Sequence, residues 1–261
     1  MLNLPAPDRT PLSSAPLPLV VAQARYSAEG SSVPADVLES VQSRLRKAGL
    51  DCPQVGTVTS ADAVSIGQAP IITSNSGFQL STLDGTWSVT LLPDSASLET
   101  RSFHSFDNQF RPYLHALLQA VSETLRPTVL QRAGLRFVNL LRSPEPGPAE
   151  WPRWVSCAVC APLQDEVVSA GVRALMQQMA LQVTDKVEST VRSGVVEAEG
   201  EPGFLLDIDT YSQPATLWSR ADAPGQFDQL NEHGVALFQT LITTEMLTRL
   251  RAPAADKEED G

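Results

Sequence analysis

Two arginines stand close together in a segment that is typical of a β-strand. The segment LQRAGLRFVNLLR, residues 130–142, alternates apolar and polar residues, and Gly134 lies midway between Arg132 and Arg136. A period of two indicates a strand with one buried face. Both guanidinium groups are therefore expected on one face of the strand. The other face carries the apolar residues Ala133, Leu135, Phe137 and Leu141. Because the net charge is −11, two cations on one face of a central strand call for a partner.

A second predicted strand offers that partner. In FLLDIDTYS, residues 204–212, Asp207 and Asp209 fall opposite the apolar Phe204, Leu206 and Ile208. If the strands are neighbours, the four charged residues form a clamp that fixes register, because the planar fork of arginine binds a carboxylate with two hydrogen bonds. Alternatively, Arg132 and Arg136 bind an anionic group or the acidic residues of a partner. Asp207 and Asp209 as general acid and base are disfavoured, since neighbouring arginines stabilise the ionised carboxylates.

Three tryptophans occupy irregular, proline-bearing segments. Trp151 and Trp154 lie in EWPRW, and Trp218 lies in PATLWSR. Tryptophans in such segments are either lids on a core or anchors of an interface. We favour the interface, because aromatic residues and arginine are enriched there. The candidate binding residues are therefore Arg132, Arg136, Asp207, Asp209, Trp151, Trp154 and Trp218.

The other reactive residue types predict no catalytic, metal or cofactor site. Cys157 and Cys160 have the C-x-x-C spacing, but a structural zinc ion normally takes four ligands, and no second Cys or His pair is present. We therefore expect small buried thiols. His233 near the start of the last predicted helix is expected to be a packing residue. The chain has no nucleophile elbow, Walker-type loop or H-E-x-x-H motif.

Composition narrows the class of protein. The isoelectric point of about 4.7 argues against nonspecific nucleic-acid binding, which needs clustered Lys and Arg. No apolar run approaches the roughly 18 to 20 residues of a membrane span, and the apolar stretch near the start lacks the basic flank of a signal peptide. An odd number of cysteines, three, argues against a disulfide framework. We expect a cytoplasmic protein without membrane contact.

The order of elements predicts an α+β fold. A strand at about 17–27 precedes a helix at 34–48, which begins at a proline and ends before Gly49. Three strands with hairpin turns and a helix at 108–125 follow. The second half has the strand at 130–142, strands at 171–184, 187–197 and 204–212, and a last helix at 226–250. Strands in runs between helices favour a twisted antiparallel sheet with helices on one face.

We interpret the chain as two similar β-α-β(3–4)-α halves that share one sheet and core. Residues 1–16 are expected to be an extended N-terminal arm, because they contain four prolines. The first half covers 17–128 and the second 129–250. Residues 251–261 form an acidic tail that is expected to be disordered.

The segment RAGLRFVNLL, residues 132–141, resembles the R-x-G-L-R-Y-x-N signature of a sporadically distributed, largely uncharacterised bacterial family of proteins of about this length. Similar segments are APLPLVVAQARYS, TWSVTLLPDSASLET, FLLDIDTYS and LNEHGVALFQTLIT, so that the resemblance extends from about residue 12 to 248. Phe137 stands where the family has tyrosine, which excludes a role for that hydroxyl group here. The family supplies no catalytic residues, and the resemblance implies an accessory protein of the kind found in mobile elements or defence systems.

Three functions follow from these observations. The leading hypothesis is a non-enzymatic cytoplasmic binding protein, an accessory subunit or regulator of a larger effector in a bacterial antiviral-defence or toxin-like module. Its protein partner would be encoded nearby. The alternative is a binder of a small anionic ligand, a nucleotide or metabolite, on the open face of the sheet. The least favoured is a carboxylate-dependent hydrolase.

Overall fold

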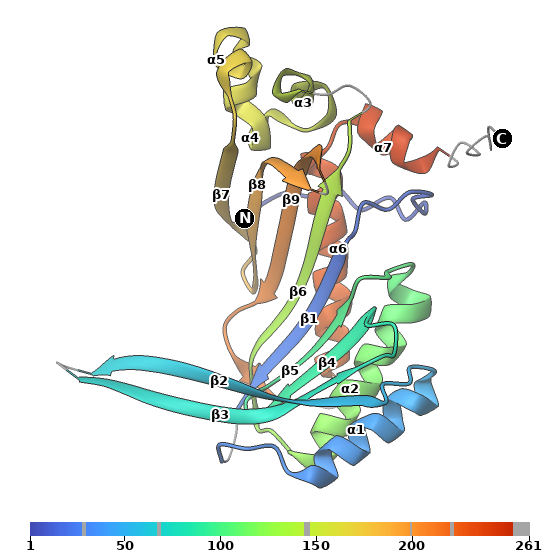
Figure 1. The fold of residues 1–261 in the computed structure, drawn as a ribbon, viewed down its shortest axis with the longest axis vertical. Helices are drawn as coiled ribbons and strands as arrows, with labels where there is room; N and C mark the ends of the chain where they lie inside the picture. The colour runs from blue at the N-terminus through green and yellow to red at the C-terminus, as the bar shows by residue number, and fades with distance from the viewer. Residues whose placement is uncertain (28–29, 67–68, 144–146, 199, 220–221, 253–261) are drawn as a thin grey trace. The chain divides into compact units, whose positions relative to one another are not determined.

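A computed structural model describes residues 1–261 except 28–29, 67–68, 144–146, 199, 220–221 and 253–261 (Figure 1). Between residues 61 and 73 it describes the backbone alone. The predicted disorder of the acidic tail concerns residues that lie almost entirely outside the described ones. No helix among the described residues is long and apolar enough to cross a membrane.

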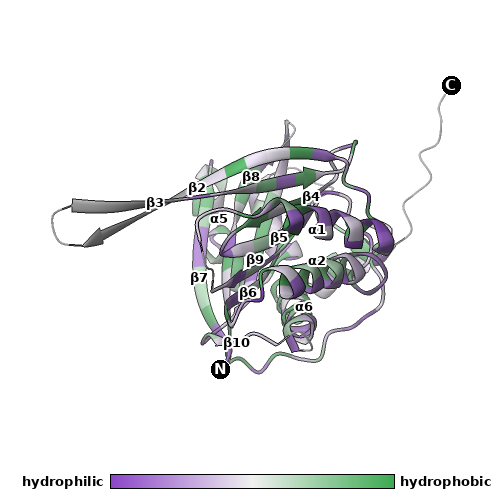
Figure 2. Cartoon of the chain, turned by 90° about the horizontal axis from the view of Figure 1, so that it is seen from below, coloured by the Kyte–Doolittle hydropathy of each residue, from purple (hydrophilic) through white to green (hydrophobic). Residues whose placement is uncertain are grey.

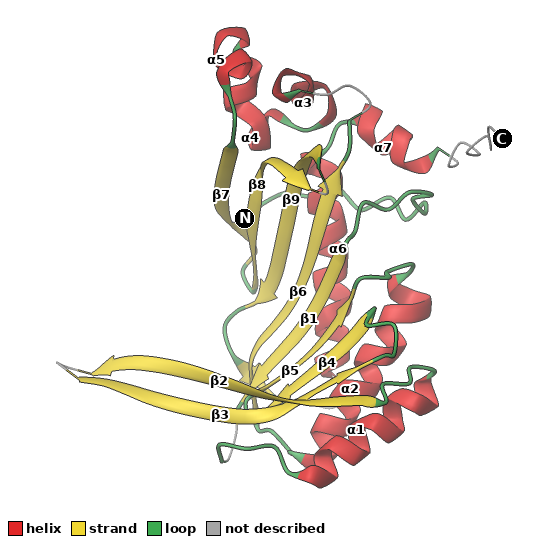
Figure 3. Ribbon diagram, viewed as in Figure 1, coloured by secondary structure: helices red, strands yellow, loops and turns green. Residues whose placement is uncertain are grey.

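The fold is the predicted α+β class, with an open antiparallel sheet (Figure 3). The strand order is β2-β3-β4-β5-β1-β6-β9-β8-β7, and the short strand β10 pairs with β6. The strands are β1 Leu19–Tyr26, β2 Gln54–Ile66, β3 Ala69–Ser81, β4 Trp87–Leu92, β5 Ser95–Thr100, β6 Val129–Leu141, β7 Leu175–Thr184, β8 Val187–Ala198, β9 Glu201–Ser212 and β10 Thr216–Leu217. The helices are α1 Ala35–Ala48, α2 Arg111–Thr124, α3 Trp151–Trp154, α4 Cys157–Cys160, α5 Glu166–Gly171, α6 Asp222–Leu241 and α7 Thr244–Arg251.

The strand order contains two series, which start at the neighbouring strands β1 and β6. Outward from β1 the order is β5, β4, β3 and β2, and outward from β6 it is β9, β8 and β7. In both series the first strand is followed by later strands in reverse chain order. The segment that corresponds to α1 is replaced in the second half by the short helices α3, α4 and α5.

The compact units are not the predicted halves. One unit comprises 1–18, 137–210 and 232–261, and we call it unit 1; the other, unit 2, comprises 19–136 and 211–231. The boundary falls inside β6, β9 and α6, because these elements are 13, 12 and 20 residues long and each contributes to both units.

Unit 2 packs α1 and α2 against one face of its strands. Helix α1 follows the predicted limits: Pro34 is its N-cap, and Gly49 ends it with φ of 102°, a left-handed conformation that glycine adopts readily. Strand β2 was not predicted. It forms with β3 a long hairpin that projects from the rest of unit 2 (Figure 1), whereas α1 and α2 lie side by side (Figure 2).

Unit 1 contains a hydrophobic cluster that includes Phe204, Leu206 and Ile208 of β9. The predicted last helix is two helices, since Thr243 caps α7 by accepting a hydrogen bond from the Met246 backbone N–H at 3.2 Å. The N-terminal arm has no regular helix or strand. Its Leu4 and Leu12 pack against the cluster, and the backbone N–H of Leu2 donates to the Gln182 carbonyl at 3.1 Å.

Candidate functional site

Strand β6 presents its arginines as the sequence predicted. Ala133 and Leu135 are fully buried, whereas Arg132 and Arg136 are intermediate in exposure. Since side chains of a strand alternate between faces, both arginines lie on the face away from the core of unit 2. We call this face the outer side of β6.

The guanidinium group of Arg132 lies close to its own strand, beside Gly134. Its Cζ is 4.4 Å from the centre of the Tyr211 ring, a cation–π contact. A Cβ atom added at Gly134 would meet Nη1 of Arg132 at 2.4 Å and Cζ at 3.0 Å. The glycine between the arginines therefore leaves the space that the guanidinium group occupies, and the tyrosine ring covers it.

The end of β9 that holds Tyr211 is bound to β6. The backbone N–H of Ala133 donates to Ser212 Oγ at 3.0 Å. Beyond β9, strand β10 pairs Thr216 with Leu130 of β6. These bonds fix the backbone on both sides of the ring, so Tyr211 forms a positioned surface for Arg132.

In unit 1 the outer side of the sheet, which is the face away from the hydrophobic cluster, carries a row of three polar side chains from three strands. Nε of Arg192 on β8 donates to Gln178 Oε1 on β7 at 3.1 Å, and Nη1 donates to Asp207 Oδ2 on β9 at 3.3 Å. The Asp207 side chain is 3% exposed, whereas that of Arg192 is 41% exposed. Asp207 thus has an arginine partner that the sequence did not predict. The predicted pairing of Arg132 and Arg136 with Asp207 and Asp209 stays a prediction.

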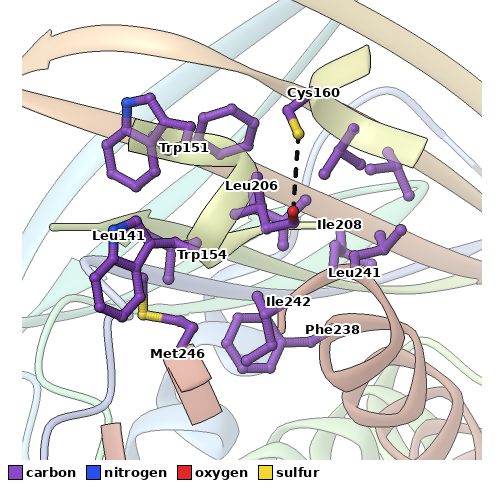
Figure 4. Close-up of a cluster of buried hydrophobic side chains, with 14 of the residues drawn as sticks. Leu141, Trp151, Trp154, Cys160, Leu206, Ile208, Phe238, Leu241, Ile242 and Met246 are labelled. Atoms are coloured by element: carbon purple, nitrogen blue, oxygen red, sulfur yellow. Dashed lines mark hydrogen bonds between the residues drawn. The ribbon is translucent and has the colours of Figure 1, made fainter. Parts of the chain in front are cut away.

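Two of the three candidate tryptophans are core residues, which corrects the preference for an interface (Figure 4). Trp151 is 1% exposed and Trp154 is 5% exposed. The Trp151 ring lies 5.2 Å from that of Phe204. Both close the hydrophobic cluster of unit 1, because their short helix α3 lies over the apolar face of β9. Trp218 is half-buried in unit 2, where its Nε1 donates to Ser122 Oγ at 3.3 Å and its ring meets Tyr26 edge-on.

The C-x-x-C pair forms the one-turn helix α4, and its cysteines are free. Cys160 is buried as expected, and its thiol donates to the Ser156 carbonyl at 3.4 Å. Burial raises the pKa of Cys160 to about 11, which disfavours the reactive thiolate. Cys157 is exposed, contrary to the expectation of buried thiols, since it begins the turn. Among the residues that the structure describes, no group of His, Cys, Asp and Glu could hold a metal ion.

One polar cluster in unit 2 was missed by the sequence analysis. Arg111 on α2 binds Asp228 on α6 with two bonds, Nε to Oδ1 at 2.7 Å and Nη2 to Oδ2 at 2.5 Å. His115, one turn after Arg111, is half-buried beside them, and burial lowers its pKa. The helical spacing of Arg111 and His115 was visible in the sequence, but Asp228 is 117 residues away from Arg111. The cluster joins two helices of unit 2. His233, the histidine that was considered, is half-buried on α6.

Comparison with known proteins identifies no relative of this chain. No protein-family model matches the chain, and the search of curated proteins finds no match. The family resemblance therefore stays a prediction that depends on the short segments quoted above. The positioned Arg132 on the outer side of β6 is the candidate site that the structure supports best.

Proposed function

We propose that this chain is a non-enzymatic binding protein that docks an acidic segment of a larger protein partner on the outer side of β6. The observation behind the proposal is the guanidinium group of Arg132, which lies between the Tyr211 ring and the space left by Gly134. Arg136 follows on the same face of the strand. Together they place two cations, four residues apart, on one face of β6.

The geometry suits a carboxylate. A guanidinium group carries five N–H donors in one plane, and two parallel donors match the two oxygens of a carboxylate. A guanidinium group that the fold already holds loses less conformational entropy on binding than a mobile one. Arg132 is therefore preorganised for recognition of Asp or Glu side chains.

The net charge of −11 makes the expected binding unusual. At long range the chain as a whole repels an acidic partner, and only a segment that reaches the arginines gains free energy. Salt screens the repulsion beyond about 8 Å at physiological ionic strength. We therefore expect the association rate to rise when salt is raised from a low to a physiological concentration, the opposite of ordinary electrostatic steering.

The biological setting is part of the proposal and rests on the resemblance alone. It is a cytoplasmic accessory subunit or regulator of a larger effector, in a bacterial antiviral-defence or toxin-like module. The partner would be encoded beside this chain. The segments that resemble the family favour this setting. The two arginines of the site imply that the docking segment of the partner is acidic.

The test is affinity purification of the full chain from its native host, with three variants beside the wild type. Arg132→Ala removes the cation, Gly134→Ala displaces it, and Arg46→Ala is the matched control, because Arg46 is an exposed, ion-paired arginine on α1. We expect a partner that co-purifies with the wild type and the control and is lost or strongly reduced with the other two. A partner that all four proteins retain would place the docking surface elsewhere.

A small anionic ligand would use the same guanidinium geometry, so the two functions need a separate measurement. A thermal-shift screen with nucleotides and metabolic phosphates distinguishes them. Stabilisation of the wild type that disappears in Arg132→Ala would favour the small ligand. The protein-partner proposal expects no such stabilisation and a co-purifying protein instead.

A further inference from the structure

The β2–β3 hairpin is a two-stranded ribbon over most of its length. Thirteen residue pairs join the strands, from Gln54 with Ser81 to Ile66 with Ala69. Strand β4 pairs with β3 only between Phe78 and Ser81. From Gly77 outward, therefore, the hairpin leaves the sheet, and a Cβ atom at Gly77 would lie 1.8 Å from the Leu91 carbonyl oxygen at the point of departure.

The two edges of this ribbon differ. The edge of β3 is covered next to Gly77, where the backbone N–H of Ser76 donates to the Ser31 carbonyl at 2.9 Å and that of Val33 donates to the Ser76 carbonyl at 3.2 Å. Strand β2 ends the strand order, and among the described residues it pairs with β3 alone. Its other edge presents backbone donors and acceptors that can bind another strand.

The composition of the ribbon favours such pairing. Residues 54–81 contain one charged residue, Asp62, in a chain that is 19% charged, and β2 contains neither lysine nor proline. Charge, lysine and proline are the usual protections of an edge strand against association. Depletion of charged residues is also typical of the core of a protein interface.

We infer that the ribbon binds a second copy of this chain, with β2 antiparallel to β2 of the other copy about a two-fold axis. The product is a four-stranded sheet, β3-β2-β2-β3. A two-stranded ribbon is marginally stable in water, and three or more strands are needed for independent stability. A second copy supplies two strands with the same uncharged composition, and the same surface on both copies closes the assembly at a dimer.

Full-length pairing fixes the register. The centre of the 13-residue strand is Ser60, so the axis passes there, and Gln54 lies opposite Ile66 of the other copy. Asp62 then lies opposite Val58, and the two Asp62 residues are four positions apart, about 14 Å at the rise of an antiparallel strand. Their mutual repulsion is screened at that separation.

Light scattering coupled to size-exclusion chromatography tests the dimer over a range of concentrations. The double variant Thr57→Lys/Thr59→Lys places lysines of the two copies on nearby diagonal positions, where like charges destabilise a sheet. We expect the wild type to be a dimer and the variant to dissociate at least tenfold more readily, with an unchanged circular dichroism spectrum. The control Gln79→Lys, at an exposed site of β3, should remain a dimer.

Cross-linking tests the register. Residues opposite each other in an antiparallel pair are close enough for a disulfide, so Ser60→Cys should form a cross-linked dimer under mild oxidation, whereas Gln79→Cys should not. Both are made with Cys157→Ser, because Cys157 is exposed.

A wild type that stays monomeric at every concentration would overturn the inference. So would a dimer that survives replacement of residues 60–75 by an Asn-Gly turn, since that variant lacks the outer part of the ribbon. Arg132→Ala should remain a dimer, which separates this result from the test of the docking site.

Discussion

Arg192 and Arg132 occupy similar positions in the two units, on the outer sides of β8 and β6, yet their surroundings differ. Arg192 donates to Asp207, whose side chain is 3% exposed, and to Gln178 on the next strand. Arg132 lies against an aromatic ring and over a glycine. The first arginine is paired with a buried carboxylate, and the guanidinium group of the second lies against the Tyr211 ring.

The difference lies in what surrounds each guanidinium group, a buried carboxylate in unit 1 and an aromatic ring in unit 2. Breaking an ion pair that contains a buried carboxylate leaves that charge poorly compensated. Removing an arginine from an aromatic ring takes away a cation–π contact, which is a smaller contribution to stability. Variants of the two arginines, and of the glycines on the same two strands, should therefore differ in stability and in binding.

The largest effect is expected at Gly194 of β8 in unit 1. A Cβ atom there would lie 1.9 Å from the Leu175 carbonyl oxygen, which is backbone and cannot rotate away. We expect Gly194→Ala to lower the free energy of unfolding by about 3 kcal/mol, as in overpacked sites. Urea denaturation followed by circular dichroism measures the loss. Wild-type stability of Gly194→Ala would show that the backbone of β7 shifts to accommodate the methyl group without loss of stability.

The next effect is expected for Arg192→Ala. It removes the arginine partner of the buried Asp207, and we expect a loss of about 2 kcal/mol, less than the roughly 3 to 5 kcal/mol of a fully buried pair, because Arg192 is 41% exposed. A double-mutant cycle with Asp207→Asn should show coupling. Additive losses would mean that Asp207 does not depend on this arginine.

The same cycle with Arg136→Ala tests the clamp that the sequence predicts. If Arg136 also compensates Asp207, Arg136→Ala should lower the melting temperature, and Asp207→Asn should add little in that background. Coupling to Arg192 with none to Arg136 would leave Arg136 to the docking site.

Arg132→Ala should lower the free energy of unfolding less than Gly194→Ala or Arg192→Ala does. The cation–π contact with Tyr211 contributes about 0.5 to 1 kcal/mol at a partly exposed site. We expect thermal unfolding close to that of the wild type, together with loss of the co-purifying partner. A loss as large as that of Arg192→Ala would make Arg132 part of a clamp and remove the contrast between the units.

The smallest effect on stability is expected for Gly134→Ala. The added methyl group meets the end of a flexible side chain rather than backbone. Alanine is also favoured over glycine in a strand by about 0.5 to 1 kcal/mol, which offsets the displacement of Arg132. We expect a free energy of unfolding within about 0.5 kcal/mol of the wild-type value, together with weaker binding of the partner. Retained binding would mean that the position of Arg132 between ring and strand is unimportant.

Much of the fold could be predicted from local patterns. The period of two in 130–142 correctly separated the buried face from the one with the arginines, and Pro34 and Gly49 marked the limits of α1. In 204–212 it correctly placed the apolar residues in the core, but Asp207 on the opposite face is buried as well. These features depend on residues within a few positions of one another. Strand β2 was missed because its small residues, as in QVGTVTSADAVSI, alternate too weakly in hydropathy to indicate a strand.

The sequence by itself determined which side of β6 carries Arg132 and Arg136, since the side-chain period of a strand is a property of the local backbone. Only the tertiary structure decided what those side chains meet. Tyr211 is 79 positions from Arg132, and Gln178 and Asp207 reach Arg192 from two other strands. The burial of Trp151 and Trp154 was likewise decided by the tertiary structure. Pairing between distant segments is set by burial and by strand order, and neither is encoded in the spacing of nearby residues.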